Sequence, residues 1–118
     1  MTDGKYNVFV YGTLMRGQKA HGFLEGAEFI GEYRLDGFAI FDLGRYPGIR
    51  ERSGYSTCGE VYGVSEDMLR EMDIYEDEGT LYHRREVTVC GTGGCLTAFV
   101  YVYAHDIPGE PIPGGRWN

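Results

Sequence analysis

The sequence predicts an α+β fold in which a small β-barrel carries at least one helix. Its 118 residues include 19 glycines, which permit many tight turns, and ten tyrosines, which favour strands with polar aromatic edges. Several segments alternate apolar and polar residues with a period of two, as half-buried strands do. A chain of this length can bury a core without staples, and no linker or repeat divides it. We therefore expect a single domain over residues 1–118.

Strands are predicted where alternation and β-forming residues lie between turn signals. The expected strands cover residues 6–10, 27–34, 37–43, 57–64, 82–90 and 95–103. Turns are expected at Asp36-Gly37, over residues 44–48 and at a four-residue hairpin loop, 91–94. The tail that follows residue 106 is rich in Pro and Gly and has no regular pattern, so we expect Trp117 to anchor it to the core.

One segment has the signals of a helix. Ser65 is a good N-cap, and the acidic residues Glu66 and Asp67 suit the positive end of the helix dipole. At about 100° per residue, one stripe of this helix collects apolar side chains and a single acid. The members of the stripe are Met68, Leu69, Met72, Tyr75 and Glu76. The helix is expected to end at about Tyr75 or Glu76. Because Glu76 belongs to the stripe, its carboxylate shares the core face.

The composition excludes several classes of function. The formal net charge is −7 and no run of Lys or Arg exceeds Arg84-Arg85, so neither a nucleic acid nor an anionic membrane is an expected partner. No stretch approaches the roughly 20 apolar residues of a membrane helix, and the first residues lack a signal-peptide core. We expect a cytoplasmic protein, and a monomer.

The cysteines and histidines lack the spacing of a metal site. Cys58, Cys90 and Cys95 form no CxxC pair and the three histidines are scattered, so no metal is expected. Cys90 and Cys95 flank the hairpin loop and can lie opposite each other, which makes a disulfide geometrically conceivable. For a cytoplasmic protein we expect two reduced thiols instead.

The loop after the first strand, Tyr11-Gly12-Thr13-Leu14, is a candidate anion-binding site. Gly12 lets the backbone approach a ligand closely, which leaves the N–H groups of Gly12, Thr13 and Leu14 free for a carboxylate or an oxyanion. The glycine spacing matches no nucleotide-binding pattern. The alternative interpretation is a plain turn without a ligand.

Glu76 is the candidate acid–base residue. Burial on an apolar helix face disfavours a charged carboxylate, so the pKa of Glu76 rises toward neutrality and the group can take and return a proton. The alternatives are a carboxylate that bends back to water at a frayed helix end, or one paired with Arg84 or Arg85. No pattern of nucleophile and histidine indicates covalent catalysis.

Several motifs, in order, resemble those of a known family. The segment from Val8 to Gln18 is similar to the "VYGTLxxGx" signature of the γ-glutamylcyclotransferase-like proteins, and most resembles their γ-glutamylamine cyclotransferase branch. A YPG turn, a GEvY strand, an LDxxE helix end and a YxR strand start are also similar. These lie at Tyr46-Pro47-Gly48, Gly59 to Tyr62, Met72 to Glu76 and Tyr82 to Arg84. The resemblance spans nearly the whole chain.

The resemblance implies a small mixed β-barrel with a few short helices. It also implies cyclisation of a γ-glutamyl amine or amide to 5-oxoproline with release of the free amine, without a cofactor. Glu76 corresponds to the family's acid–base glutamate, and Tyr11-Gly12-Thr13-Leu14 to its substrate-holding loop. Many members have glycine directly after that glutamate, whereas Asp77 and Glu78 precede Gly79 here, so alignment on the glycine would choose Glu78. We expect Glu76, because only Glu76 lies on the apolar stripe.

A second hypothesis is a non-catalytic domain on the same fold that binds a small carboxylate, and a third is a structural domain without a ligand. The presence of Glu76 favours the enzyme, although a fold does not determine a function. Formation of 5-oxoproline from γ-glutamyl compounds distinguishes the first hypothesis from the other two.

Overall fold

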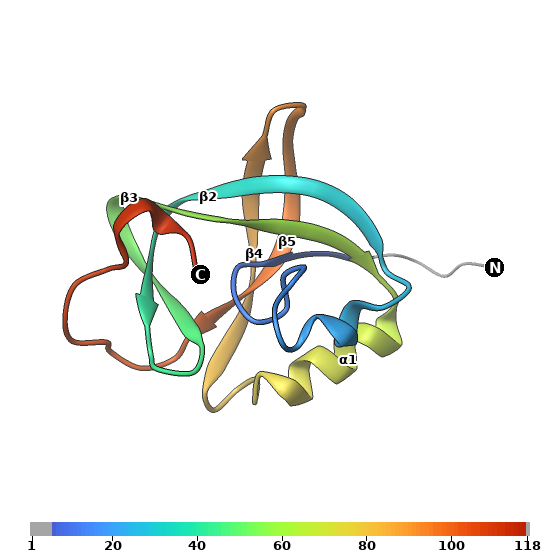
Figure 1. The fold of residues 1–118 in the computed structure, drawn as a ribbon, viewed down its shortest axis with the longest axis horizontal. Helices are drawn as coiled ribbons and strands as arrows, with labels where there is room; N and C mark the ends of the chain where they lie inside the picture. Colours follow the sequence, from blue (N-terminus) through green and yellow to red (C-terminus); the bar gives the residue numbers. More distant parts are fainter. Residues whose placement is uncertain (1–5, 118) are drawn as a thin grey trace.

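The computed structural model describes residues 6–117 and consists of a closed five-stranded barrel flanked by one α-helix. The strands are β1 (Tyr6–Val10), β2 (Glu28–Asp42), β3 (Pro47–Val64), β4 (Tyr82–Gly91) and β5 (Gly94–Tyr103). The helical segments are α1 (Glu66–Tyr75) and two short 3₁₀ turns, η1 (His21–Leu24) and η2 (Pro113–Gly115). Figure 1 shows β2 and β3 as long curved strands, the β4–β5 hairpin extending beyond them, and α1 beside η1.

The barrel is mixed because of one parallel pair. The strand order is β1-β3-β2-β4-β5, and β1 closes the barrel between β3 and β5. It pairs antiparallel with β3, with Val10 opposite Glu60, and parallel with β5, with Val8 opposite Phe99. The loop that follows Val10 therefore leaves the barrel between β3 and β5.

The turn expected at Asp36-Gly37 is wrong, because β2 continues through it. Gly37 has a φ of 88°, and the register between β2 and β3 shifts between Asp36 and Phe38. This is a β-bulge, which needs the same positive-φ glycine as many turns and so has the same local signal. The next turn is confirmed but ends early: the Leu43 N–H donates to the Tyr46 carbonyl, and β3 begins at Pro47 rather than at residue 57.

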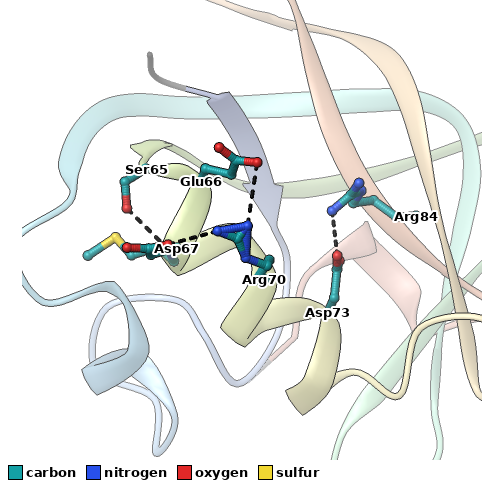
Figure 2. A network of polar contacts seen from close by, with 7 residues as sticks. Ser65, Glu66, Asp67, Arg70, Asp73 and Arg84 are labelled. Carbon is teal, nitrogen blue, oxygen red and sulfur yellow. Dashed lines mark hydrogen bonds and ion pairs between the residues drawn. The ribbon is translucent and has the colours of Figure 1, made fainter. Parts of the chain in front are cut away.

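Helix α1 has the boundaries that the sequence predicts. The Ser65 hydroxyl accepts a hydrogen bond from the Met68 N–H at 3.2 Å, which confirms the N-cap. On the exposed side, Arg70 forms ion pairs with Glu66 and Asp67 (Figure 2). These exposed pairs add little stability, so packing of the opposite face holds the helix.

The second half of strand β1, residues 8–10, is buried on both faces. Val8 packs in a cluster with Leu69 and Met72 of α1, whereas Phe9 belongs to a second cluster formed by residues of the barrel strands, such as Val100. Successive side chains of a strand point to opposite faces, so β1 separates the helix side of the core from the barrel interior.

The C-terminal tail packs on the barrel. The Ile112 N–H donates to the Ile40 carbonyl at 2.8 Å, and Trp117 packs against both core clusters. The expected anchoring by Trp117 is confirmed.

The two cysteines of the hairpin form a disulfide. Cys90 pairs directly with Cys95 in the β4–β5 ladder, with their Cα atoms 4.0 Å apart, and a disulfide joins them. The preference for two reduced thiols, which came from the expected compartment alone, does not match this structure. Gly91 pairs with Gly94, so the loop is also tighter than the four residues expected.

Within residues 6–117, no helix has the length and hydropathy needed to cross a membrane. In the same part of the chain, no three His, Cys, Asp or Glu residues lie close enough to hold a metal ion.

Candidate active site

A cavity of about 160 Å³ lies where the loop after β1 faces the C-terminal end of α1. All five site residues predicted from the sequence contribute to its wall. The lining residues are Phe9, Val10, Tyr11, Gly12, Thr13, Leu14, Tyr46, Pro47, Tyr75, Glu76, Leu81, Tyr82 and Tyr101. An engineered cavity of about 150 Å³ in another protein holds benzene, so a small ring fits a space of this size.

The loop over residues 11–14 lines this cavity and contributes backbone N–H groups close to it. Within residues 6–117, the N–H groups of Gly12, Thr13 and Leu14 have no acceptor. The loop is nevertheless held at several points: the Met15 N–H donates to the Gly12 carbonyl at 3.0 Å, and the Thr13 hydroxyl lies 3.0 Å from that of Tyr75. A fixed loop with three unused donors is suited to hold an anion.

Tyr11 turns its side chain inward and keeps its proton. Its hydroxyl donates to the Tyr101 carbonyl at 2.6 Å. Burial raises the pKa of Tyr11 well above its ordinary value, and the nearby Tyr82 and Glu76 raise it further. Tyr11 is therefore a neutral wall of the cavity rather than a base.

Gly12 is required by protein packing, which the sequence argument did not foresee. A Cβ at this position would lie 2.5 Å from Pro47 Cγ and 2.7 Å from Pro47 Cδ. Pro47 itself lines the cavity, and its carbonyl accepts a hydrogen bond from the Tyr82 hydroxyl at 2.7 Å. The glycine thus allows two segments of the cavity wall to meet.

We expect Gly12→Ala to destabilise the fold by about 1–3 kcal/mol and to weaken 5-oxoproline binding, because Pro47 or the loop must move. Gly22→Ala is the matched control, since a Cβ at Gly22 meets nothing within 4 Å; it should change stability by no more than about 0.5 kcal/mol. Urea unfolding and ligand titration of both variants provide the measurement. Unchanged stability and affinity in Gly12→Ala would contradict the packing argument.

Glu76 is the acid in the cavity wall. It is the C-cap residue of α1, partly buried, and within residues 6–117 its side chain forms no ion pair or hydrogen bond. The alternative of a salt bridge is wrong, because Arg84 pairs with Asp73 at 2.6 Å and Arg85 with Glu51 at 3.7 Å. Burial raises the pKa of Glu76 to about 7.

The residues after Glu76 determine which of the two glutamates faces the cavity. Asp77 has a φ of 54°, and the Glu78 N–H donates to the Asp73 carbonyl, as in a Schellman motif, where the left-handed residue is usually glycine. Asp77 therefore occupies the position at which many family members have glycine. Glu78 is exposed, and its carboxylate accepts from the Arg84 N–H at 3.3 Å. In this register Glu76 is the residue that faces the cavity.

A polar network that the sequence did not reveal holds the end of α1. Asp73 accepts from Arg84 of β4 at 2.6 Å and from the Tyr101 hydroxyl of β5 at 2.7 Å. Figure 2 shows Asp73 facing Arg84 across the gap between α1 and β4. Because Asp73 lies one helical turn before Glu76, the network positions the carboxylate against the barrel. The one sequence signal for this network is the spacing of Asp73 and Glu76 in the LDxxE-like motif.

Comparison with known proteins places the chain in a family. A model of the family described as gamma-glutamyl cyclotransferase, AIG2-like, matches residues 8–118. The chain belongs to this family. A relative from Vibrio cholerae is 40% identical over 98 residues, 81% of this chain and 80% of that protein. The gamma-glutamylaminecyclotransferase of Bos taurus is 35% identical over 113 residues, 82% of this chain and 65% of that protein.

The fold is shared with a solved structure of the same kind. The crystal structure of an AIG2-like protein from Mus musculus matches with a TM-score of 0.82 and 31% identity, covering 90% of this chain and 82% of that one. The family resemblance and the mixed barrel expected from the sequence are both confirmed. The matched residues include the loop after β1 and Glu76.

Proposed function

We propose that this protein converts a γ-glutamyl amine or amide to 5-oxoproline and the free amine, with Glu76 as general base and then general acid. The observation that carries the proposal is that one small cavity is lined by a carboxylate and by three backbone N–H groups, none of which has a hydrogen-bond or ion-pair partner in the part of the chain that the structure describes. The name of the bovine relative supports an amine as the leaving group.

The reaction needs proton transfer and little else. Glu76 removes a proton from the substrate α-ammonium, and the resulting amine attacks the γ-carbonyl carbon to close a five-membered ring. Glu76 then protonates the amide nitrogen, whose bond to the γ-carbon breaks. The ring nitrogen loses its extra proton to solvent, and the released amine takes one up. One carboxylate thus serves both steps, and acid–base catalysis of this kind raises the rate by about 10²–10⁴-fold.

The pKa of Glu76 suits this double role. At about 7, the carboxylate and carboxylic acid forms are both well populated near neutral pH, so Glu76 can accept a proton and return it. The loop N–H groups would hold either the substrate carboxylate or the oxyanion that forms on the γ-carbonyl oxygen.

The shape of the cavity orients the substrate. Tyr46 and Tyr75 line the cavity yet are 37% and 39% exposed, so they form its mouth, whereas Tyr11, Tyr82 and Tyr101 are buried. The γ-glutamyl group would lie inside, against the loop and Glu76. The amine would leave between the two mouth tyrosines, whose rings suit an apolar or aromatic substituent.

A panel of γ-glutamyl amines and γ-glutamyl amino acids tests the proposal, with 5-oxoproline and free amine measured as products. We expect both products in equal amounts with at least one γ-glutamyl amine. Binding of 5-oxoproline in the cavity without any turnover across the panel would contradict it and favour the carboxylate-binding hypothesis.

A further inference from the structure

A second carboxylate, which the proposed reaction does not use, is buried behind the loop. Glu60 on β3 is 9% exposed, and no other acidic residue among residues 6–117 is as deeply buried. Burying a carboxylate costs free energy unless hydrogen bonds or charges compensate for it, so its partners reveal its role.

The partners of Glu60 connect it to the far end of the anion-binding loop. Its Oε1 accepts from the backbone N–H of Arg16 at 3.0 Å and from the Tyr62 hydroxyl at 2.9 Å. Its Oε2 lies 3.5 Å from Arg16 Nε. The Arg16 side chain is half exposed, so the bond to the Arg16 N–H is the better protected of the two links.

The register explains how Glu60 reaches the loop. Glu60 pairs with Val10, the last residue of β1, and so stands where the strand ends and the loop begins. From there its side chain spans to Arg16, two residues beyond Leu14. The loop that contains Gly12, Thr13 and Leu14 is thus fixed at one end by the ladder and at the other by Glu60.

We infer that Glu60 is a positioning residue, which holds the donors of residues 12–14 in place by accepting the Arg16 N–H. This inference rests on the proposed role of the loop in binding an anion. The essential property of Glu60 is the reach of its oxygen, and its negative charge is secondary.

Two substitutions distinguish the effect of the length of the Glu60 side chain from the effect of its charge. Glu60→Gln keeps the length and an oxygen acceptor but loses the charge, so affinity for 5-oxoproline should stay within about three-fold of wild type. Glu60→Asp keeps the charge but draws its oxygens back by one carbon–carbon bond, beyond hydrogen-bonding range. Its affinity should fall about ten-fold or more. Glu32→Ala is the matched control, because the Glu32 side chain is exposed and, within residues 6–117, forms an ion pair with the Arg16 guanidinium and no other side-chain contact of this kind. It should leave affinity unchanged.

The separate effects of Glu60→Asp on KM and on kcat identify which group of the substrate the loop holds. A higher KM in Glu60→Asp with unchanged kcat would indicate that the loop holds the substrate carboxylate in both ground and transition states, and a lower kcat would indicate the oxyanion. Either result supports the inference, whereas wild-type affinity and kinetics in folded Glu60→Asp, or a larger loss in Glu60→Gln than in Glu60→Asp, overturns it.

Hydrogen exchange of the Arg16 amide keeps this inference separable from the proposed function. Exchange should be slow in the wild type and in Glu60→Gln, and faster in Glu60→Asp, whether or not the protein turns over any substrate. Equal exchange in all three proteins would show that Glu60 does not hold the loop. Absence of 5-oxoproline formation by the wild type would instead count against the proposed function alone.

Discussion

Glu76→Gln is expected to lower turnover of a γ-glutamyl amine at least a hundred-fold, equivalent to roughly 3 kcal/mol of activation free energy. Glutamine keeps the size and hydrogen-bonding capacity of the side chain but cannot shuttle a proton. Binding of 5-oxoproline should persist, because the loop N–H groups are untouched. Steady-state kinetics on the best substrate of the panel, with ligand titration of the same preparation, provide the measurement.

Glu78→Gln is the matched control for this prediction. Glu78 is exposed, lies outside the cavity and should leave turnover within a few-fold of wild type. Wild-type turnover should also fall below a pH of about 7, as Glu76 becomes protonated. If Glu78→Gln were the inactive variant, the assignment of the acid–base residue would be wrong despite the position of Asp77.

The parts of the fold that the sequence predicts correctly depend on local patterns. Strand β1, helix α1 and the β4–β5 hairpin each follow from alternation, capping or turn residues within a few positions of one another. The bulge at Gly37 could not be predicted, because a positive-φ glycine ends a strand or bends one depending on its partner strand. The disulfide does not follow from the expected compartment, which favours reduced thiols; it follows from the direct pairing of Cys90 with Cys95 across the hairpin.

The residues of the candidate site also divide into those that local patterns in the sequence predict and those that depend on distant partners. Local patterns predict Glu76, which lies on a periodic helix face, and the loop over residues 11–14, which follows a strand. Local patterns do not predict the roles of the residues that shape and support the site, such as Pro47, Tyr101 and Glu60, because each acts through a partner at least 28 positions away. Neither periodicity nor spacing reports such contacts.

The same carboxylate should make the fold less stable at high pH. The unfolded chain releases the Glu76 proton near pH 4.5, whereas burial holds the pKa of the folded protein at about 7. Between these values the folded state binds more protons than the unfolded state, so stability falls as pH rises through this window. Above it the full cost of the buried charge applies, roughly 3 kcal/mol.

Glu76→Gln should therefore stabilise the protein at pH 8 by up to about 3 kcal/mol relative to its effect at pH 4, because the amide carries no charge to bury. The measurement is the difference in unfolding free energy between variant and wild type at both pH values, so that titration of all other groups cancels. Glu78→Gln should show nearly the same difference at both. An activity loss in Glu76→Gln without this pH-dependent gain would mean that the carboxylate acts on the substrate from a well-solvated position. The gain without the activity loss would mean that Glu76 is buried for another reason, and the base would have to be sought elsewhere.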